Sequence, residues 1–156
     1  MKRTSPTPSL EKETVLSLLK AADRVRRHFQ HVVEPWGLTV QQFNVLRILR
    51  GAGPRGLPTL EVGERMIEKT PGVTRLLDRL AEKGWVRRDR CAEDRRQVFC
   101  RITQEGLGRL AELDEPIEEA DRACLEKLTP AEKGRLASLA SRVGLGEPST
   151  RAGSPP

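Results

Sequence analysis

Apolar residues recur at helical spacing through the first third of the chain and predict two helices. The first covers about 25 residues, opens after Ser9 as a helix cap and stops at the Glu-Pro-Trp-Gly sequence of residues 34–37. Thr39 and Gln42 then stand three residues apart, which is the spacing of a capping box and begins the second helix. The Gly- and Pro-rich residues 51–56 are expected to form a loop.

Two short helices are predicted next. The third runs from Leu60 to about Glu68 with Thr59 as its cap, and the fourth begins with Thr70 as its cap and Pro71 at its first helical position. Only about two residues separate them, which is typical of a helix-turn-helix. The fourth helix has an aliphatic inner stripe, made by Val73, Leu76, Leu77 and Leu80.

Period-two alternation indicates two strands after the fourth helix, at residues 85–90 and 97–102. The polar residues 91–96 between them form the tip of a hairpin. A hairpin that directly follows a helix-turn-helix makes a winged helix. The predicted fold class is therefore mainly α with a small β-hairpin: a winged helix-turn-helix DNA-binding core plus N- and C-terminal dimerisation helices.

Helical spacing returns after the hairpin. Thr103 caps a fifth helix that runs to about Leu128, and Pro116 inside it is expected to bend or loosen it. Residues 129–132 form a complete capping box that begins a sixth helix, which reaches Val143. The first, fifth and sixth helices carry long apolar stripes outside the winged-helix core, and a twofold partner is the commonest way to bury such stripes.

The expected organisation is a single domain over residues 9–143. Within it the winged helix-turn-helix covers about 38–103, and the dimerisation helices cover about 9–34 and 103–143. Residues 1–8, with two prolines among Ser and Thr, are interpreted as a flexible tail. Residues 144–156 are interpreted as a disordered tail because of their Gly, Pro and Ser content.

Charge is distributed unevenly along this plan. The 156 residues carry a net charge of +6, with a pI near 9.7. Residues 69–101 hold ten basic and five acidic residues, whereas residues 102–143 hold six basic and nine acidic ones. The winged-helix part is thus expected to meet an anion, and the acidic part is expected to serve another purpose.

Several classes of protein are excluded at this stage. No apolar run approaches the length of a membrane span, and the first residues lack the apolar segment of a secretory signal. Three cysteines without a Cys-x-x-Cys pair fit the reducing cytoplasm. The chain has no phosphate-binding glycine loop, catalytic nucleophile motif or metal-protease motif. We expect neither an enzyme nor a bound cofactor.

The predicted winged helix places suitable side chains for double-stranded DNA. The start of the fourth helix presents Thr70, Gly72, Thr74 and Arg75, and an arginine on a helix in the major groove can bind guanine with two hydrogen bonds. Arginines at the hairpin tip suit the negative potential of a narrow minor groove. Strand arginines suit phosphates. The full candidate DNA-binding set is Thr59, Thr70, Pro71, Gly72, Thr74, Arg75, Arg79, Arg87, Arg88, Asp94, Arg95 and Arg96.

Four motifs resemble the MarR family of bacterial transcriptional regulators. They are Leu-Thr-x-x-Gln-Phe-x-Val-Leu at 38–46, Val-Thr-Arg-Leu-Leu-Asp-Arg-Leu-x-x-Lys-Gly-Trp-Val-Arg-Arg at 73–88, Glu-Asp-Arg-Arg at 93–96 and Ile-Thr-x-x-Gly at 102–106. The resemblance covers roughly residues 10 to 143. It implies a homodimer joined through the first, fifth and sixth helices. It also implies a palindromic operator, usual action as a repressor, and release by a small-molecule effector.

The resemblance also implies roles for matching residues. Pro71, Thr74 and Arg75 lie where the family's recognition helix meets the major groove. Arg95 and Arg96 lie where its wing enters the minor groove, with Asp94 orienting one of them. The chain departs from the family pattern at Ile67 and Lys69, which predicts a helix-turn-helix turn of different shape or one extended by a helical step.

Alternative interpretations remain for function and for several residues. A ligand-independent activator or architectural DNA-binding module, or a winged helix that binds an acidic protein, would have the same pattern. His28 and His31 share a helix face, but two ligands do not make a metal site. Cys100 fits a strand core, Cys91 lies near arginines that lower a thiol pKa, and the redox role of either, or of Cys124, stays open.

Overall fold

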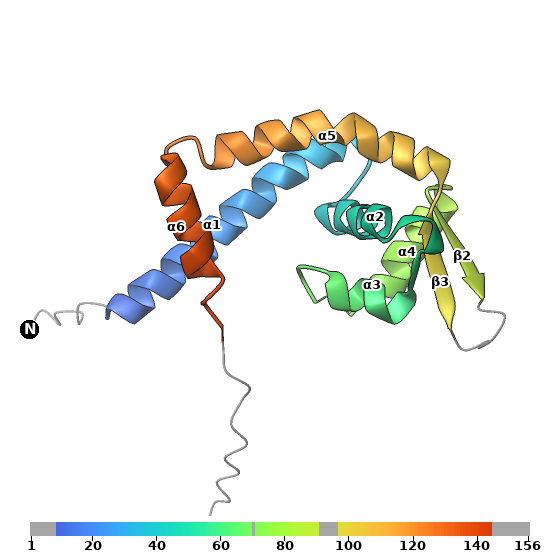
Figure 1. Ribbon diagram of the computed structural model, residues 1–156, viewed down its shortest axis with the longest axis horizontal. Helices are drawn as coiled ribbons and strands as arrows, with labels where there is room; N and C mark the ends of the chain where they lie inside the picture. Colours follow the sequence, from blue (N-terminus) through green and yellow to red (C-terminus); the bar gives the residue numbers. More distant parts are fainter. Residues whose placement is uncertain (1–8, 70, 91–96, 145–156) are drawn as a thin grey trace, which may run out of the picture. The chain divides into compact units, whose positions relative to one another are not determined.

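The computed structural model describes residues 9–69, 71–90 and 97–144. The chain divides into two compact units, residues 1–120 and residues 121–156. Figure 1 labels the elements in chain order. The helices and strands are α1 (Leu10–Val33), α2 (Val40–Ala52), β1 (Leu57–Pro58), α3 (Thr59–Arg65), α4 (Val73–Glu82), β2 (Val86–Arg90), β3 (Val98–Ile102), α5 (Gln104–Cys124) and α6 (Pro130–Ala140), with short 3-10 turns at 34–36 and 53–55.

The predicted caps of α1, α2 and α6 form as expected. Ser9 accepts a hydrogen bond from the Lys12 amide, and the Thr39 and Gln42 side chains complete the capping box of α2. The capping box at residues 129–132 starts α6 in the same way. Each cap depends on side chains only three residues from the amide they satisfy, which is why the sequence predicts them.

Some predicted helix ends are wrong. α5 ends at Cys124 rather than near residue 128, and α6 ends at Ala140 rather than Val143. α5 continues through Pro116, which costs one backbone hydrogen bond without ending the helix. The six-helix order itself is confirmed, and both predicted strands form.

The sheet has a third strand that periodicity did not reveal. Its order is β1-β3-β2, and both pairs are antiparallel. Gly56 precedes β1 with a φ of 67°, and a Cβ added there would lie 2.2 Å from the Cys100 carbonyl oxygen. Only glycine therefore lets this strand approach β3 so closely. A strand of two residues shows no alternation, so the sequence pattern predicts only the hairpin.

The core of the first unit is aliphatic, as a chain with 3% aromatic residues requires. α2 and α4 pack on each other, and α2 also packs on β3. Phe43 and Trp85 are the buried aromatic side chains among the described residues, and Cys100 is fully buried, as predicted. The largest fully buried side chains are Leu46, Leu49, Leu77, Leu80, Leu110 and Leu113.

The Ile-Thr-x-x-Gly step joins the sheet to α5. The Thr103 hydroxyl donates to the Gly84 carbonyl at 2.7 Å and accepts from the Gly106 amide at 3.1 Å. A Cβ on Gly106 would lie 2.3 Å from the Trp85 carbonyl oxygen. The glycine lets the first turn of α5 lie directly on the backbone that starts β2, so the motif fixes the wing against the helix.

Two glycines of α5 give a matched test of this contact. Gly106→Ala is expected to lower the free energy of unfolding by about 1–3 kcal/mol, because the new methyl group overlaps backbone. Gly108→Ala has open space around the same substitution and is expected to raise it by about 0.5–1 kcal/mol. Chemical denaturation of both variants measures the difference, and equal effects would contradict the close-approach argument.

Candidate nucleic-acid interface

α4 presents opposite chemistry on its two faces. Leu77 and Leu80 are fully buried in the core, and Val73 and Leu76 pack against the same cluster. This burial forces the remaining positions outward. Thr74, Arg75 and Arg79 are exposed, and none of the three side chains has an ion pair or hydrogen bond within the described part of the chain. α4 therefore presents two arginines, one helical turn apart, to a partner.

The connection between α3 and α4 is longer than predicted. α3 ends at Arg65 rather than near residue 68, because Met66 turns into the core with an extended backbone and is 3% exposed. α4 begins at Val73 with Gly72 as its N-cap residue, so Pro71 lies before the helix rather than at its first position. Thr70, the predicted cap, lies outside the described residues. Seven residues, 66–72, thus separate the two helices.

Lys69, one of the two departures from the family pattern, and its neighbour Glu68 hold this connection in place. The Lys69 ammonium donates to the Glu64 carbonyl at 2.7 Å, which satisfies a group at the end of α3. The Glu68 carboxylate lies 3.5 Å from Arg26 of α1 and accepts from Gln41 of α2 at 3.4 Å. These contacts hold residues 68 and 69 against α1, α2 and the end of α3. That the turn differs from the family's in shape or length stays a prediction.

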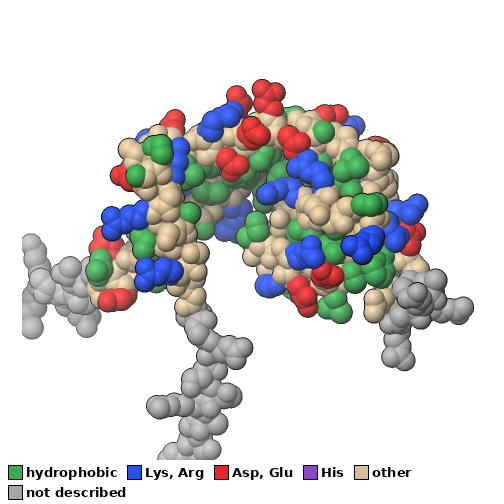
Figure 2. Space-filling view, in the orientation of Figure 1, with side chains coloured by type: hydrophobic (Ala, Val, Ile, Leu, Met, Phe, Trp, Pro, Cys, Tyr) green, Lys and Arg blue, Asp and Glu red, His purple; other side chains and the backbone are tan. Residues whose placement is uncertain are grey.

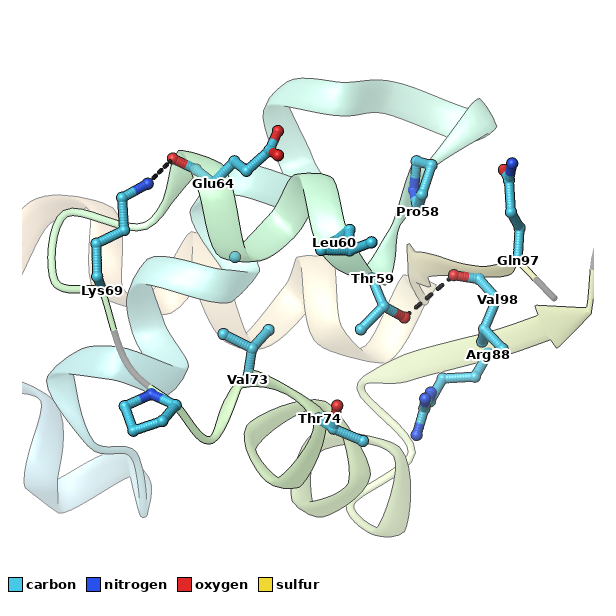
Figure 3. Close-up of a pocket in the computed structure, with 12 residues that line it drawn as sticks. Pro58, Thr59, Leu60, Glu64, Lys69, Val73, Thr74, Arg88, Gln97 and Val98 are labelled. Atoms are coloured by element: carbon cyan, nitrogen blue, oxygen red, sulfur yellow. Dashed lines mark hydrogen bonds between the residues drawn. The ribbon is translucent and has the colours of Figure 1, made fainter.

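A groove of about 790 Å³ lies between α3, the start of α4 and the sheet. Figure 3 shows Thr59 and Leu60 on one wall and Val73 and Thr74 on another, with Arg88 on β2, Val98 on β3 and Gln97 just before β3. Thr59 does not cap α3 as predicted. Its hydroxyl donates to the Val98 carbonyl at 3.1 Å and so ties α3 to β3.

The strand arginines are paired with carboxylates rather than free. Arg88 of β2 donates to Asp78 of α4, and Arg87 lies 3.0 Å from Asp89. Asp89 also lies 2.5 Å from Arg101 of β3. Arg90 is exposed and has no such pair within the described residues. The predicted tip residues Asp94, Arg95 and Arg96 lie outside the described residues.

Four residues outside the predicted site make contacts that shape this surface: Asp78, Asp89, Arg101 and Glu68. The alternation of opposite charges in Arg-Arg-Asp-Arg at 87–90 is a signal for pairing across the sheet. Figure 2 shows acidic side chains along α5 and basic side chains over the part that holds α2, α3 and α4. The division of charge inferred from the sequence thus has a spatial counterpart.

The cysteine and histidine alternatives gain little support. Burial and the nearby Asp121 carboxylate raise the pKa of the Cys124 thiol, which lowers its thiolate fraction at neutral pH. Cys91 lies outside the described residues. The described part of the chain has no group of three or more His, Cys, Asp or Glu placed to hold a metal ion. None of the described helices is long and apolar enough to cross a membrane.

Comparison with known proteins identifies the winged-helix region independently. A model of the MarR family matches residues 38–98. The structure is similar to a crystal structure of a MarR transcription factor from Planctomyces limnophilus, with a TM-score of 0.69 and 34% sequence identity over 88% of this chain and 99% of that one.

Two further relatives are named for what they do. The first is BpsR of Bordetella bronchiseptica, solved in work on the regulation of its DNA binding by 6-hydroxynicotinic acid. Its TM-score is 0.75 at 25% identity, over 83% of this chain and 96% of that one. The homoprotocatechuate degradative operon repressor of Escherichia coli is 27% identical over 80% of this chain and 82% of its own length.

Proposed function

The chain belongs to the MarR family and is a winged-helix transcriptional regulator, and from this premise we propose that it acts as a homodimeric repressor of a palindromic operator. The exposed face of α4 carries this proposal. Arg75 and Arg79 point away from a buried leucine stripe and have no intramolecular partner within the described residues. A helix with such a face fits the major groove, where arginine reads guanine.

In this proposal the other candidate residues either contact DNA directly or position those that do. Thr74 and Arg75 contact base edges, and the tip residues Asp94, Arg95 and Arg96 serve the minor groove. Pro71 and Gly72 bring the connection to the start of α4, next to Thr70. Thr59 acts indirectly, since its hydroxyl holds α3 on β3.

A twofold dimer buries an apolar face of each copy, and α1 has an apolar face that is exposed in the single chain. Leu10 is 75% exposed and Leu19 is 62% exposed, although both lie on a long regular helix. In the second unit, Leu136 and Leu139 of α6 are exposed in the same way. We propose that these stripes meet their counterparts in a second copy, which sets the two α4 helices about one DNA turn apart, roughly 10 base pairs.

Repression and release follow from relatives rather than from this surface. One relative is named an operon repressor, and the DNA binding of another is regulated by a small aromatic acid. We propose that this chain likewise represses in the cytoplasm and is released by a small-molecule effector. We assign it no enzymatic activity, because the compared proteins are transcription factors and regulators of DNA binding.

Removal of the Arg75 side chain tests the DNA-binding role. Fluorescence anisotropy compares the DNA upstream of the gene for this protein with a scrambled duplex, at about 150 mM salt, where phosphate binding is already weakened. The wild-type protein is expected to prefer the upstream duplex by about a thousandfold. Arg75→Ala is expected to lose about 1–3 kcal/mol on that duplex and to relax one base position.

The matched control is Arg24→Ala, which removes the same charge from an exposed position on α1. Its affinity for the upstream duplex is expected to stay near the wild-type value. Equal loss on both duplexes for Arg75→Ala, or equal loss for the two variants, would reject base readout by Arg75.

Dimerisation is tested on adjacent residues of α1. Leu19→Gln is expected to weaken the dimer. A leucine buried at the interface contributes about 1.5–3 kcal/mol to the free energy of association, and a twofold dimer contains two copies of it. Lys20→Gln changes an exposed polar neighbour and is expected to leave the dimer intact. Sedimentation velocity at several concentrations measures both, and a wild-type protein that is monomeric throughout would contradict the proposal.

A further inference from the structure

Asp78 places a carboxylate on α4 in the middle of its basic face. It follows Arg75 by three residues and directly precedes Arg79. Its side chain is 47% exposed and accepts a hydrogen bond from Arg88 of β2, whose side chain is 24% exposed. The Arg88 Nε is buried and has no hydrogen-bond partner. The Asp78 carboxylate is therefore the ion-pair partner that holds this guanidinium.

Arg88 lies where a free cation would meet DNA. It lines the same groove as Thr74 of α4 and Thr59 of α3 (Figure 3). An arginine at this position that lacked a partner would bind phosphate regardless of base sequence, because phosphate contacts carry no sequence information. In the unbound protein, the Asp78 carboxylate already offsets the positive charge of Arg88.

The same arrangement recurs on the strands. Asp89 lies between Arg87 and Arg101, at 3.0 Å and 2.5 Å. Of the described arginines on β2 and β3, Arg90 alone has no carboxylate partner. Asp78 and Asp89 thus offset about half of the positive charge of the four strand arginines. Within the described residues, Arg75 and Arg79 on α4 have no carboxylate partner.

We infer that Asp78 is a specificity-determining residue whose carboxylate occupies Arg88 and withholds that arginine from sequence-independent phosphate binding. The inference rests on the proposed binding of α4 to DNA. Random DNA is held almost entirely through phosphates, whereas the operator is also held through base contacts from the α4 face. The pair therefore lowers affinity for random DNA more than affinity for the operator.

Asp78→Asn keeps the size of the side chain and removes its charge. On a scrambled duplex at about 50 mM salt, its Kd is expected to fall about threefold or more, and the slope of log K against log salt to steepen by about 0.9, the value for one added phosphate contact. The operator affinity is expected to rise less, so the ratio of the two affinities falls. Anisotropy titrations from about 50 to 200 mM salt measure all three quantities.

Asp114→Asn is the matched control. It removes the same charge from an ion pair between α2 and α5, in which Arg50 and Asp114 lie 2.9 Å apart, and neither residue lines the groove. Its salt slope on random DNA is expected to match the wild type. A slope that steepens equally in both variants would show a general effect of net charge and would overturn the assignment to Asp78.

Arg88→Gln tests the inference without relying on the fold of the first variant. If Arg88 is withheld, its removal leaves the salt slope on random DNA unchanged in the wild-type background and cancels the gain in the Asp78→Asn background. A slope that falls by about 0.9 in Arg88→Gln alone would show that Arg88 already contacts phosphate and would overturn the inference. An unchanged random-DNA affinity in Asp78→Asn would do the same.

Failure of the proposed function has a different signature. It appears in the wild-type protein, as equal and weak binding to both duplexes, before any variant is compared. If the wild type prefers the operator and Asp78→Asn loses affinity equally on both duplexes, Asp78 only supports the structure of the wing, and the specificity role is wrong.

Discussion

The surface of this protein depends on the burial of one leucine stripe. Leu77 and Leu80 of α4 are wholly enclosed, and they pack in a core that has few aromatic side chains to fill space. Since α4 has only ten residues, this burial fixes its rotation about its own axis. The positions of Thr74, Arg75 and Arg79 follow as a consequence. The burial of the leucines on one face of α4 therefore decides which side chains the opposite face exposes.

The strands of the wing are held against one another and against the neighbouring helices by three different kinds of contact. Close backbone approach at Gly56 and Gly106 sets the distances from β1 to β3 and from α5 to the start of β2. The Thr59 hydroxyl donates to Val98 and so joins α3 to β3. The Thr103 hydroxyl donates to Gly84, just before β2, and accepts from Gly106 in α5. Ion pairs then orient the strand arginines. Exposed ion pairs contribute little to stability, so their main effect here is on the charge that the surface offers to a partner.

This division between paired and unpaired arginines bears on how a basic protein can remain selective. Every arginine that faces DNA without a partner adds affinity for any sequence. A surface whose arginines all lacked carboxylate partners would bind DNA of any sequence with high affinity. Carboxylates within the surface reduce that background, while Arg75 and Arg79, on the helix that can reach base edges, stay uncompensated by any described residue.

The sequence by itself determined the helix order, the caps of α1, α2 and α6, and the family. Ser9, Thr39 and Thr129 interact with amides three residues away, so chain-local physics predicts them. The Ile-Thr-x-x-Gly motif likewise signals the close approach at Gly106. The candidate site was predictable as a region, because the charge of residues 69–101 and the spacing of α4 are both visible in the sequence.

Only the tertiary structure decided the start of α4, the third strand and the pairing of charges. Thr70 and Pro71 form a good local start signal, yet burial of Met66 and the contacts of Glu68 with α1 and α2 delay the helix to Val73. β1 is too short to show a pattern. Asp78 and Arg88 are ten residues apart on different elements. Such contacts depend on distances through space, which the packing of α4 against the sheet sets and a linear pattern does not contain.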